Sequence, residues 1–275
     1  MAINRVEIKD FLVFKGEFAA DFCEGINVLI GGNGTGKTTL LRCLYKQQGR
    51  GVFVTVKEKI ERYVYIPEKD ILEHAKGLLT FIEHKPTGFN EIYKDVLVSA
   101  QDIPTTIQSE TQKKIGDTIS NIIGGHVEWE HGDGSFYTVR TDGKRIPFAS
   151  EASGFKKLGF LGLLVMSGQL EPGTILFWDE PENSINPEQV PIFVDILLEL
   201  SRNRVQIFLA THSEILASYI NALHKNNDKV MFFSLYKDDD IIKYDKDERF
   251  DLLKPNSIIA EQAKLYEKEI ERVLR

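Results

Sequence analysis

Apolar and polar side chains alternate along residues 3–22, and Lys15 and Gly16 interrupt the alternation near its middle. A period of two residues predicts β-strands, and the interruption predicts an antiparallel pair. A compact, mainly apolar segment with glycine on both sides follows at Ile26–Ile30. This composition is typical of a strand buried on both faces of a parallel sheet. The pattern also predicts a helix over residues 38–46 and strands over residues 52–56 and 63–66.

The next part of the chain carries a weaker pattern. Residues 68–121 are helical in character but poorly periodic, and Pro86 and Pro104 break them. Beyond them, residues 127–130 and 136–139 alternate with a period of two around a turn that contains two glycines. These two segments predict a β-hairpin.

In the second half, residues 154–166 are apolar nearly all round, which predicts a buried helix. Strand-like and helix-like segments alternate after it, and this alternation is typical of a doubly wound parallel sheet. The alternating segments are residues 174–178, 187–200, 205–210 and 214–223.

The end of the chain predicts two closing strands, at residues 230–235 and 241–244, with a solvated acidic turn at residues 238–240. A helix is predicted from about Ser257, because apolar residues recur at spacings of four and three. We expect this apolar stripe to pack on the protein's own core. The stripe consists of Ile259, Ala263, Tyr266, Ile270 and Val273.

Composition narrows the class of protein. The chain has 275 residues, 42% of them hydrophobic, which is ample for a buried core. No apolar run approaches the ~18–20 residues that a membrane span needs. The only two cysteines, Cys23 and Cys43, cannot build a disulfide framework, so we expect a cytoplasmic protein. A net charge of -7 argues against a protein dedicated to coating DNA.

The strongest chemical signal follows the buried strand at Ile26–Ile30. Residues 31–38 read GGNGTGKT, which matches the GxxxxGK[ST] pattern between a strand and a helix. Glycines let successive backbone N–H groups face phosphate oxygens, Lys37 reaches the outer phosphates, and the Thr38 hydroxyl is a ligand for Mg²⁺. The predicted cofactors are therefore ATP and Mg²⁺. The candidate nucleotide-binding residues here are Gly31, Asn33, Gly34, Thr35, Gly36, Lys37, Thr38 and Thr39.

A second signal is the pair of carboxylates that ends the apolar segment at residues 174–178. Asp179 is placed to hold Mg²⁺ together with Thr38. Glu180 is a candidate general base for the water that attacks the γ-phosphate, since that role needs a carboxylate within hydrogen-bond reach. Together with Lys37, Glu180 is therefore a predicted catalytic residue.

A third signal is His212, which follows the apolar segment at residues 205–210. An imidazole at a strand end can donate to the γ-phosphate. Ser213 beside it is also a good helix N-cap, which offers a purely structural explanation. The combination with the phosphate-binding loop and the two carboxylates favours a catalytic role for His212.

Taken together, these residues resemble the ABC-type P-loop ATPases, over nearly the whole chain. The similarity is to the soluble branch that includes chromosome-maintenance and recombination-repair ATPases and phage-defence proteins of the overcoming-lysogeny-defect type. Residues 179–182 resemble the Walker B motif with its catalytic glutamate, residues 183–186 the D-loop, and His212 the switch histidine. The resemblance implies an α/β fold, with a mixed sheet, antiparallel N-terminal strands and a helical insert.

The resemblance also implies roles for weaker matches. Ser153 and Gly154, at the start of a predicted helix, correspond to the signature motif that caps the ATP of an opposite subunit. In the place of the Q-loop glutamine stands Glu68. We expect one ATPase domain in two lobes, lobe I at about residues 1–66 with an insert at about 67–124, and lobe II at about 125–275. Neither a coiled-coil arm nor a nuclease domain is expected.

The implied function is Mg-ATP binding and hydrolysis that drives head-to-tail homodimerisation and acts on a protein effector partner or on DNA, with no membrane segment in cis. DNA repair and phage defence are the processes that the resemblance suggests. Three alternatives stay open: a nucleotide-binding subunit of a membrane transporter, a P-loop phosphotransferase, and an ATP-dependent nucleic-acid clamp with little turnover. A basic face for the clamp could come from Lys113-Lys114, Lys144-Arg145 and Lys156-Lys157.

Overall fold

The computed structural model describes residues 2–45, 49–58, 60, 62–69, 72, 91–101, 108–131 and 134–274. Within these ranges a central sheet of six strands has the order β12-β11-β3-β10-β9-β5. All neighbours run parallel except β12, which pairs antiparallel with β11 at the edge. The strands are β3 (Ile26–Ile30), β5 (Arg62–Ile66), β9 (Thr174–Asp179), β10 (Gln206–Thr211), β11 (Val230–Asp238) and β12 (Ile241–Asp247).

Two smaller sheets flank the central one. In the first, β1 (Ile3–Phe11) pairs antiparallel with both β2 (Phe14–Asp21) and β4 (Val52–Val56). The predicted N-terminal pair is therefore present, and β4 adds a third strand to it. In the second, the predicted hairpin of β6 (Gly125–Glu130) and β7 (Ser135–Arg140) gains β8 (Arg145–Pro147). Gly132 and Asp133, at the tip of that hairpin, lie outside the described residues.

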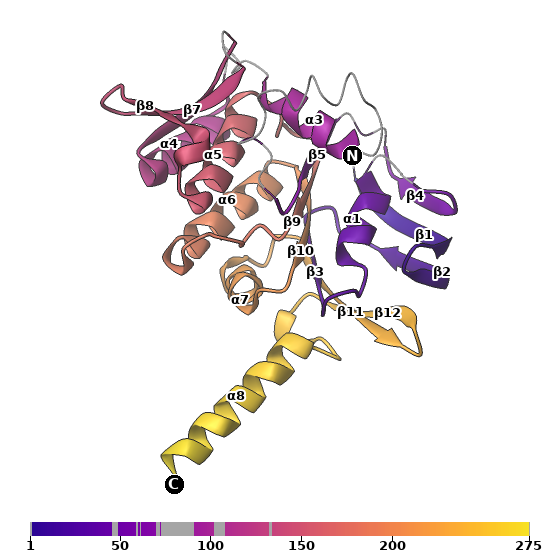
Figure 1. The fold of residues 1–275 in the computed structure, drawn as a ribbon. Coiled ribbons are helices and arrows are strands. Elements are labelled where there is room, and N and C mark those ends of the chain that lie inside the picture. Colours follow the sequence, from indigo (N-terminus) through magenta and orange to yellow (C-terminus); the bar gives the residue numbers. More distant parts are fainter. Residues whose placement is uncertain are drawn as a thin grey trace.

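Helices cover both faces of the central sheet (Figure 1). On one side lies α1 (Lys37–Leu44), together with the sheet of β1, β2 and β4. On the other side lie α5 (Ser153–Met166), α6 (Val190–Arg202) and α7 (Glu214–Leu223). The α/β class and the mixed sheet predicted from the sequence are confirmed. The other elements are α3 (Glu91–Ala100), α4 (Glu110–Ile123), α8 (Ser257–Val273) and the 3₁₀ turns Phe148–Ser150, Pro187–Gln189 and Phe250–Leu252.

The burial pattern explains why these elements form. Every residue of β3, β9 and β10 is buried, as expected for strands with helices on both faces. Phe177 of β9 stacks on Phe208 of β10 and on Tyr65 of β5, which ties the middle of the sheet together. Helix α4 starts at a capping box, in which Ser109 and Gln112 satisfy each other's backbone N–H groups. Pro86 and Pro104, the predicted breaks in the helical stretch at residues 68–121, lie outside the described residues.

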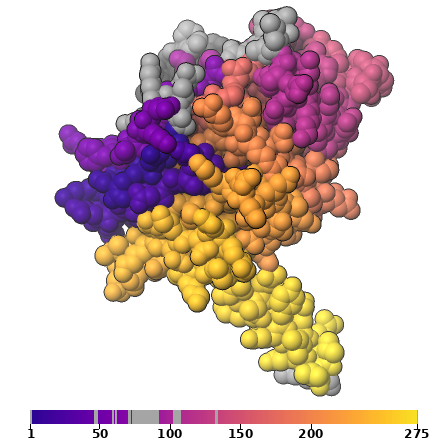
Figure 2. Space-filling view, turned by 180° about the vertical axis from the view of Figure 1, so that it is seen from behind, coloured from indigo at the N-terminus to yellow at the C-terminus, as the bar shows by residue number. Residues whose placement is uncertain are grey.

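The helix predicted from Ser257 is present as α8, but it does not pack on the core as expected. None of its residues is buried, and it stands clear of the body (Figures 1 and 2). Only its first turn, at Ile258 and Ile259, touches the core. Hydrogen bonds hold its base: the Phe250 N–H donates to Asn221 of α7 at 3.0 Å, and Asn256 donates to the Phe250 carbonyl oxygen at 2.9 Å.

In the part of the chain that the structure describes, no helix combines the length and the apolar character that crossing a membrane requires.

Candidate active site

Three neighbouring strands, β3, β10 and β9, run parallel and end at the same edge of the central sheet. The phosphate-binding loop follows β3, Asp179 is the last residue of β9, and His212 follows β10. In open α/β sheets, ligands bind at the carboxyl ends of parallel strands. Candidate residues that are far apart in the sequence therefore meet at one edge.

The loop between β3 and α1 curls tightly. Gly31 has φ +148°, and a Cβ there would lie 2.3 Å from the Leu235 carbonyl oxygen, so only glycine fits. Lys37 is buried, and its Nζ donates to the carbonyl oxygens of Gly31 and Gly32 at 2.7 and 3.1 Å. The ammonium group thus lies inside the curl of the loop, beside the amino end of α1, where phosphate binds in other proteins.

The remaining loop residues divide between the rim and the interior. Asn33 and Gly34 are exposed, whereas Thr35 is buried and donates to the Gly32 carbonyl oxygen at 2.8 Å. Gly36 has φ +91° and directly precedes α1, and Thr39 is half-buried in the first turn of that helix. The tip of the loop is therefore open to solvent while its base is fixed.

The two predicted metal ligands are in direct contact. The Thr38 Oγ1 donates to Asp179 Oδ1 at 3.1 Å. Hydroxyl and carboxylate oxygens are ligands that Mg²⁺ takes together with substrate phosphates. This donor set fits a magnesium ion held between the protein and a nucleotide.

Burial destabilises the charges of this site. It raises the pKa of Asp179, against a hydrogen bond from Thr38 that favours the carboxylate. It lowers the pKa of Lys37, while the carboxylates of Glu180, Asp179 and Glu182 act in the opposite direction. A phosphate beside Lys37 and a cation beside Asp179 would offset this desolvation.

Glu180 follows β9 directly and adopts φ +50°, a left-handed conformation that is rare outside glycine. Its N–H donates to the Ala210 carbonyl oxygen at 2.8 Å. Its carboxylate accepts a hydrogen bond from Asn183 Nδ2 at 2.7 Å and lies 3.1 Å from His212 Nδ1. Backbone and side-chain contacts therefore both fix the direction of this carboxylate.

His212 is the more exposed partner, with 52% of its side chain accessible. Glu182 lies 4.0 Å from the same ring nitrogen. Its Oε1 accepts a hydrogen bond from Thr211 at 2.5 Å, while its buried Oε2 has no hydrogen-bond partner among the described residues. Glu180 and His212, each predicted separately as a catalytic residue, are thus in contact, with the Glu182 carboxylate beside them.

Ser153 and Gly154 lie in the first turn of α5, and the turn that follows β9 packs against them. A Cβ on Gly154 would lie 2.6 Å from the Ser184 carbonyl oxygen. Just before them, the carboxylate of Glu151 forms a partly buried ion pair with Arg140 of β7, whose Nη2 donates to both carboxylate oxygens, at 2.7 and 2.8 Å. The start of α5 is therefore rigidly held between β7 and the turn after β9.

Glu68 lines a cavity of about 230 Å³ that Thr38 and Asp179 also line. It acts with burial to raise the pKa of Asp179, whereas Arg42 lowers it. Arg42 and Tyr65 line the same cavity. The sequence patterns did not single out these last two residues, because neither belongs to a motif.

The basic pair Lys156-Lys157 is not part of a basic face. Both residues are buried in α5, at 7% and 9% exposure, and the Lys157 Nζ donates to the Glu180 carbonyl oxygen at 2.7 Å. The sequence does indicate that these lysines are buried, because residues 154–166 are apolar nearly all round and leave no solvated helix face for a lysine. The sequence patterns did not predict this contact between Lys157 and Glu180.

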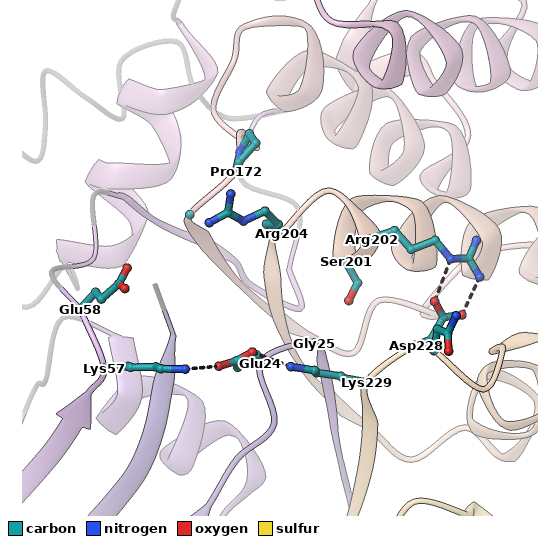
Figure 3. Close-up of a pocket in the computed structure, with 12 residues that line it drawn as sticks. Glu24, Gly25, Lys57, Glu58, Pro172, Ser201, Arg202, Arg204, Asp228 and Lys229 are labelled. Atoms are coloured by element: carbon teal, nitrogen blue, oxygen red, sulfur yellow. Dashed lines mark hydrogen bonds and ion pairs between the residues drawn. The ribbon is translucent and has the colours of Figure 1, made fainter.

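A larger cavity, of about 580 Å³, lies at the opposite edge of the central sheet, at the amino ends of its parallel strands. Figure 3 shows its charged lining. Glu24 accepts hydrogen bonds from Lys57 at 3.0 Å and from Lys229 at 2.6 Å, and Arg202 makes a bidentate pair with Asp228. None of the predicted site residues lines this cavity.

The fold and the loop at residues 31–38 define the class as a P-loop protein with the ABC-type ATPase fold. Residues 57–218, more than half of the chain, match the family model described as AAA domain, putative AbiEii toxin, Type IV TA system. Residues 5–45 match a second model, described as AAA domain. The chain belongs to the first of these AAA-domain families. No curated protein matches it.

Solved structures share the fold at low sequence identity. The Smc head bound to the C-winged helix domain of ScpA has a TM-score of 0.56 and 10% identity, over 90% of this chain and 97% of that chain. An Smc head with an extended coiled coil, from Pyrococcus furiosus, has a TM-score of 0.54 and 11% identity, over 98% and 99%. A part of an ABC transporter complex from Clostridium perfringens has a TM-score of 0.53 and 13% identity, over 100% and 99%.

Proposed function

We propose that this protein binds Mg-ATP at the carboxyl edge of its central sheet and hydrolyses it to ADP and phosphate. One observation carries the proposal. The ends of β3, β9 and β10 bring a phosphate-binding loop, a Thr38–Asp179 pair and a Glu180–His212 pair to one edge. A P-loop phosphotransferase would have no use for the second pair, so its presence favours hydrolysis.

The chain's own residues divide the chemistry. Lys37 and the loop N–H groups bind the phosphates, and Thr38 and Asp179 hold the metal. When bound, Mg²⁺ neutralises charge on the outer phosphates. Glu180 accepts a proton from the attacking water, and His212 orients the Glu180 carboxylate and donates toward the γ-phosphate.

We further propose that two copies close head to tail on ATP, with Ser153 and Gly154 of each copy capping the nucleotide of the other. The amino end of α5 can face a phosphate, and its tight packing on the turn after Glu180 makes it rigid. Because the capping contacts exist only in the closed dimer, ATP favours closure and hydrolysis reverses it.

The closing and reopening of this dimer is proposed to act on a protein effector or on DNA. The matching family's description, a putative toxin of a type IV toxin–antitoxin system, supports a defence role over DNA repair. The ScpA domain bound to the Smc head supports a protein effector as the type of partner. Burial of Lys156 and Lys157 removes one of the three basic pairs on which a nucleic-acid clamp would depend.

Light scattering after gel filtration tests the proposal with Glu180→Gln protein, in which ATP binding is kept and hydrolysis falls about a hundredfold or more. Its mass should double with Mg-ATP and stay monomeric without it. Lys37→Ala is the control and should remain monomeric in both conditions. If Glu180→Gln binds ATP and its mass never changes, the capping role of Ser153 and Gly154 is wrong.

A further inference from the structure

Helix α5 carries a buried lysine beside the proposed general base. Lys157 is 9% exposed, in a helix whose other side chains are mostly apolar. Its Nζ donates to the main-chain carbonyl oxygen of Glu180 at 2.7 Å. Burying an ammonium group is costly unless it makes strong hydrogen bonds, so this contact gives the lysine a specific task.

The contact bears on the backbone of Glu180, whose conformation is unfavourable without support from its surroundings. Glu180 has φ +50°, which a non-glycine residue keeps only where its surroundings fix it. The Glu180 N–H donates to the Ala210 carbonyl oxygen. The Glu180 carbonyl oxygen accepts hydrogen bonds from the Asn183 N–H, at 3.2 Å, and from Lys157. Of the two donors to this carbonyl oxygen, Asn183 is three residues away, whereas Lys157 belongs to α5 and is 23 residues away in the chain.

The rest of α5 strengthens this link. Lys157 lies four residues after Ser153, so the two side chains share one face of the helix. Beside them, Gly154 packs so closely on the Ser184 carbonyl oxygen that no side chain fits between. Two contacts, one turn apart, therefore join the start of α5 to the segment that runs from Glu180 to Ser184.

We propose that Lys157 is a positioning residue for Glu180. Through the Glu180 carbonyl oxygen it fixes the left-handed backbone, and thereby the direction in which the carboxylate points. Because Lys157 and Ser153 share a helix face, it also couples that direction to the position of the first turn of α5. This inference rests on the proposed ATPase function.

The experiment compares three variants under single-turnover conditions, with thermal unfolding to confirm that each is folded. Lys157→Met keeps the length of the side chain and removes the donor, and Lys157→Arg keeps a donor. Lys156→Met is the matched control, since Lys156 is an adjacent, equally buried lysine of the same helix. ATP affinity and the hydrolysis rate are measured separately for each protein.

Lys157→Met should lower the hydrolysis rate about 10- to 100-fold with ATP affinity unchanged within about twofold, because misplacing a reacting group slows chemistry without weakening binding. Lys157→Arg should recover a large part of the rate, and Lys156→Met should stay within about twofold of wild type. Equal losses in both methionine variants, or an unchanged rate in Lys157→Met, would overturn the proposal.

A second readout separates this inference from the proposed function. His212 contacts the Glu180 carboxylate, so the NMR shifts of its imidazole ring report the placement of Glu180 without nucleotide. They should move in Lys157→Met and not in Lys156→Met. If wild-type protein hydrolyses no ATP, the proposed function fails, and these shifts alone decide whether Lys157 positions Glu180.

Should Lys157→Met fail to fold, the wild-type protein still decides the point. The ammonium protons of Lys157 should be protected from solvent exchange by the hydrogen bond to Glu180. A fast-exchanging ammonium group would overturn the proposal.

Discussion

The two edges of the central sheet treat charge in opposite ways. At the amino edge, Lys57 and Lys229 share Glu24, and these side chains are 42–61% exposed. At the carboxyl edge, Lys37 and Asp179 are 7% and 5% exposed, and burial acts against the charged form of each. Exposed ion pairs contribute little to the free energy of folding, whereas each buried charge carries a desolvation penalty.

This difference shows which observation locates a site. The amino edge has the larger cavity, about 580 Å³, but its charges largely neutralise one another at the surface. The carboxyl edge has a smaller cavity, strained backbone at Glu180 and a buried ammonium group that faces carbonyl oxygens. Buried charge identifies the candidate active site here, and cavity size does not.

The largest expected effect is on ATP affinity, when one basic residue at each edge is replaced by alanine. Lys37→Ala should weaken ATP binding at least about a hundredfold, since losing one partner of a buried charge contact costs about 3–5 kcal/mol. Arg204→Ala, at the rim of the amino-edge cavity, should leave ATP affinity within about twofold of wild type. Isothermal titration calorimetry measures both, and a comparable loss in Arg204→Ala would place the nucleotide at the other edge.

A smaller effect tests the rigid packing at the carboxyl edge. Gly154→Ala puts a Cβ 2.6 Å from the Ser184 carbonyl oxygen, which should lower stability by about 1–3 kcal/mol in urea unfolding. Gly162→Ala is the control in the same helix, where the new Cβ lies 3.1 Å from Cγ2 of Ile119, so that this side chain needs to shift by only a few tenths of an ångström. There the better helix propensity of alanine should offset the contact. Equal stabilities for the two variants would contradict a close approach at Gly154.

The smallest effect belongs to the amino edge. Hydrogen bonds from Lys229 and Lys57 lower the pKa of Glu24 to about 2, from an ordinary value of 4.5. A depressed carboxyl pKa stabilises the folded state above the unfolded pKa, and the contribution is lost as the pH falls from about 4.5 toward 2. Because the group is well exposed, Glu24→Gln should cost no more than about 1 kcal/mol at pH 7.

Urea unfolding of wild type and Glu24→Gln, at pH 7 and pH 3 and at low and high salt, checks this expectation. The difference between the two proteins should shrink at pH 3 and at high salt. A difference of several kcal/mol that ignores salt would mean that the amino edge is as strongly coupled as the carboxyl edge.

Much of the fold could be predicted from local pattern. Apolar segments at Ile26–Ile30 and at residues 174–178 became buried strands on either side of β10 in a parallel sheet, and the residues after them came together because such strands end at one edge. The motif around Lys37 and the two carboxylates at the end of β9 could be found for the same reason. The pattern of apolar and polar residues therefore identifies the helices and strands, and the positions at which the strands end.

Pattern could not identify contacts between elements that are distant in the chain. The bond from Lys157 to Glu180 depends on how α5 docks, and the cavity position of Arg42 depends on how α1 meets β5 and β9. The expectation that α8 packs on the core was wrong because an apolar stripe specifies that a helix has a face, and does not specify what lies against it.

The way α8 stands clear of the body has a mechanical consequence. At about 1.5 Å per residue its 17 residues form a rod of roughly 25 Å. Asn221 of α7, Phe250 and Asn256 link its base by hydrogen bonds to the helix that begins two residues after His212. The rod is therefore a lever whose fulcrum lies on α7, and a tilt of 10° at the base would sweep its tip through roughly 4 Å.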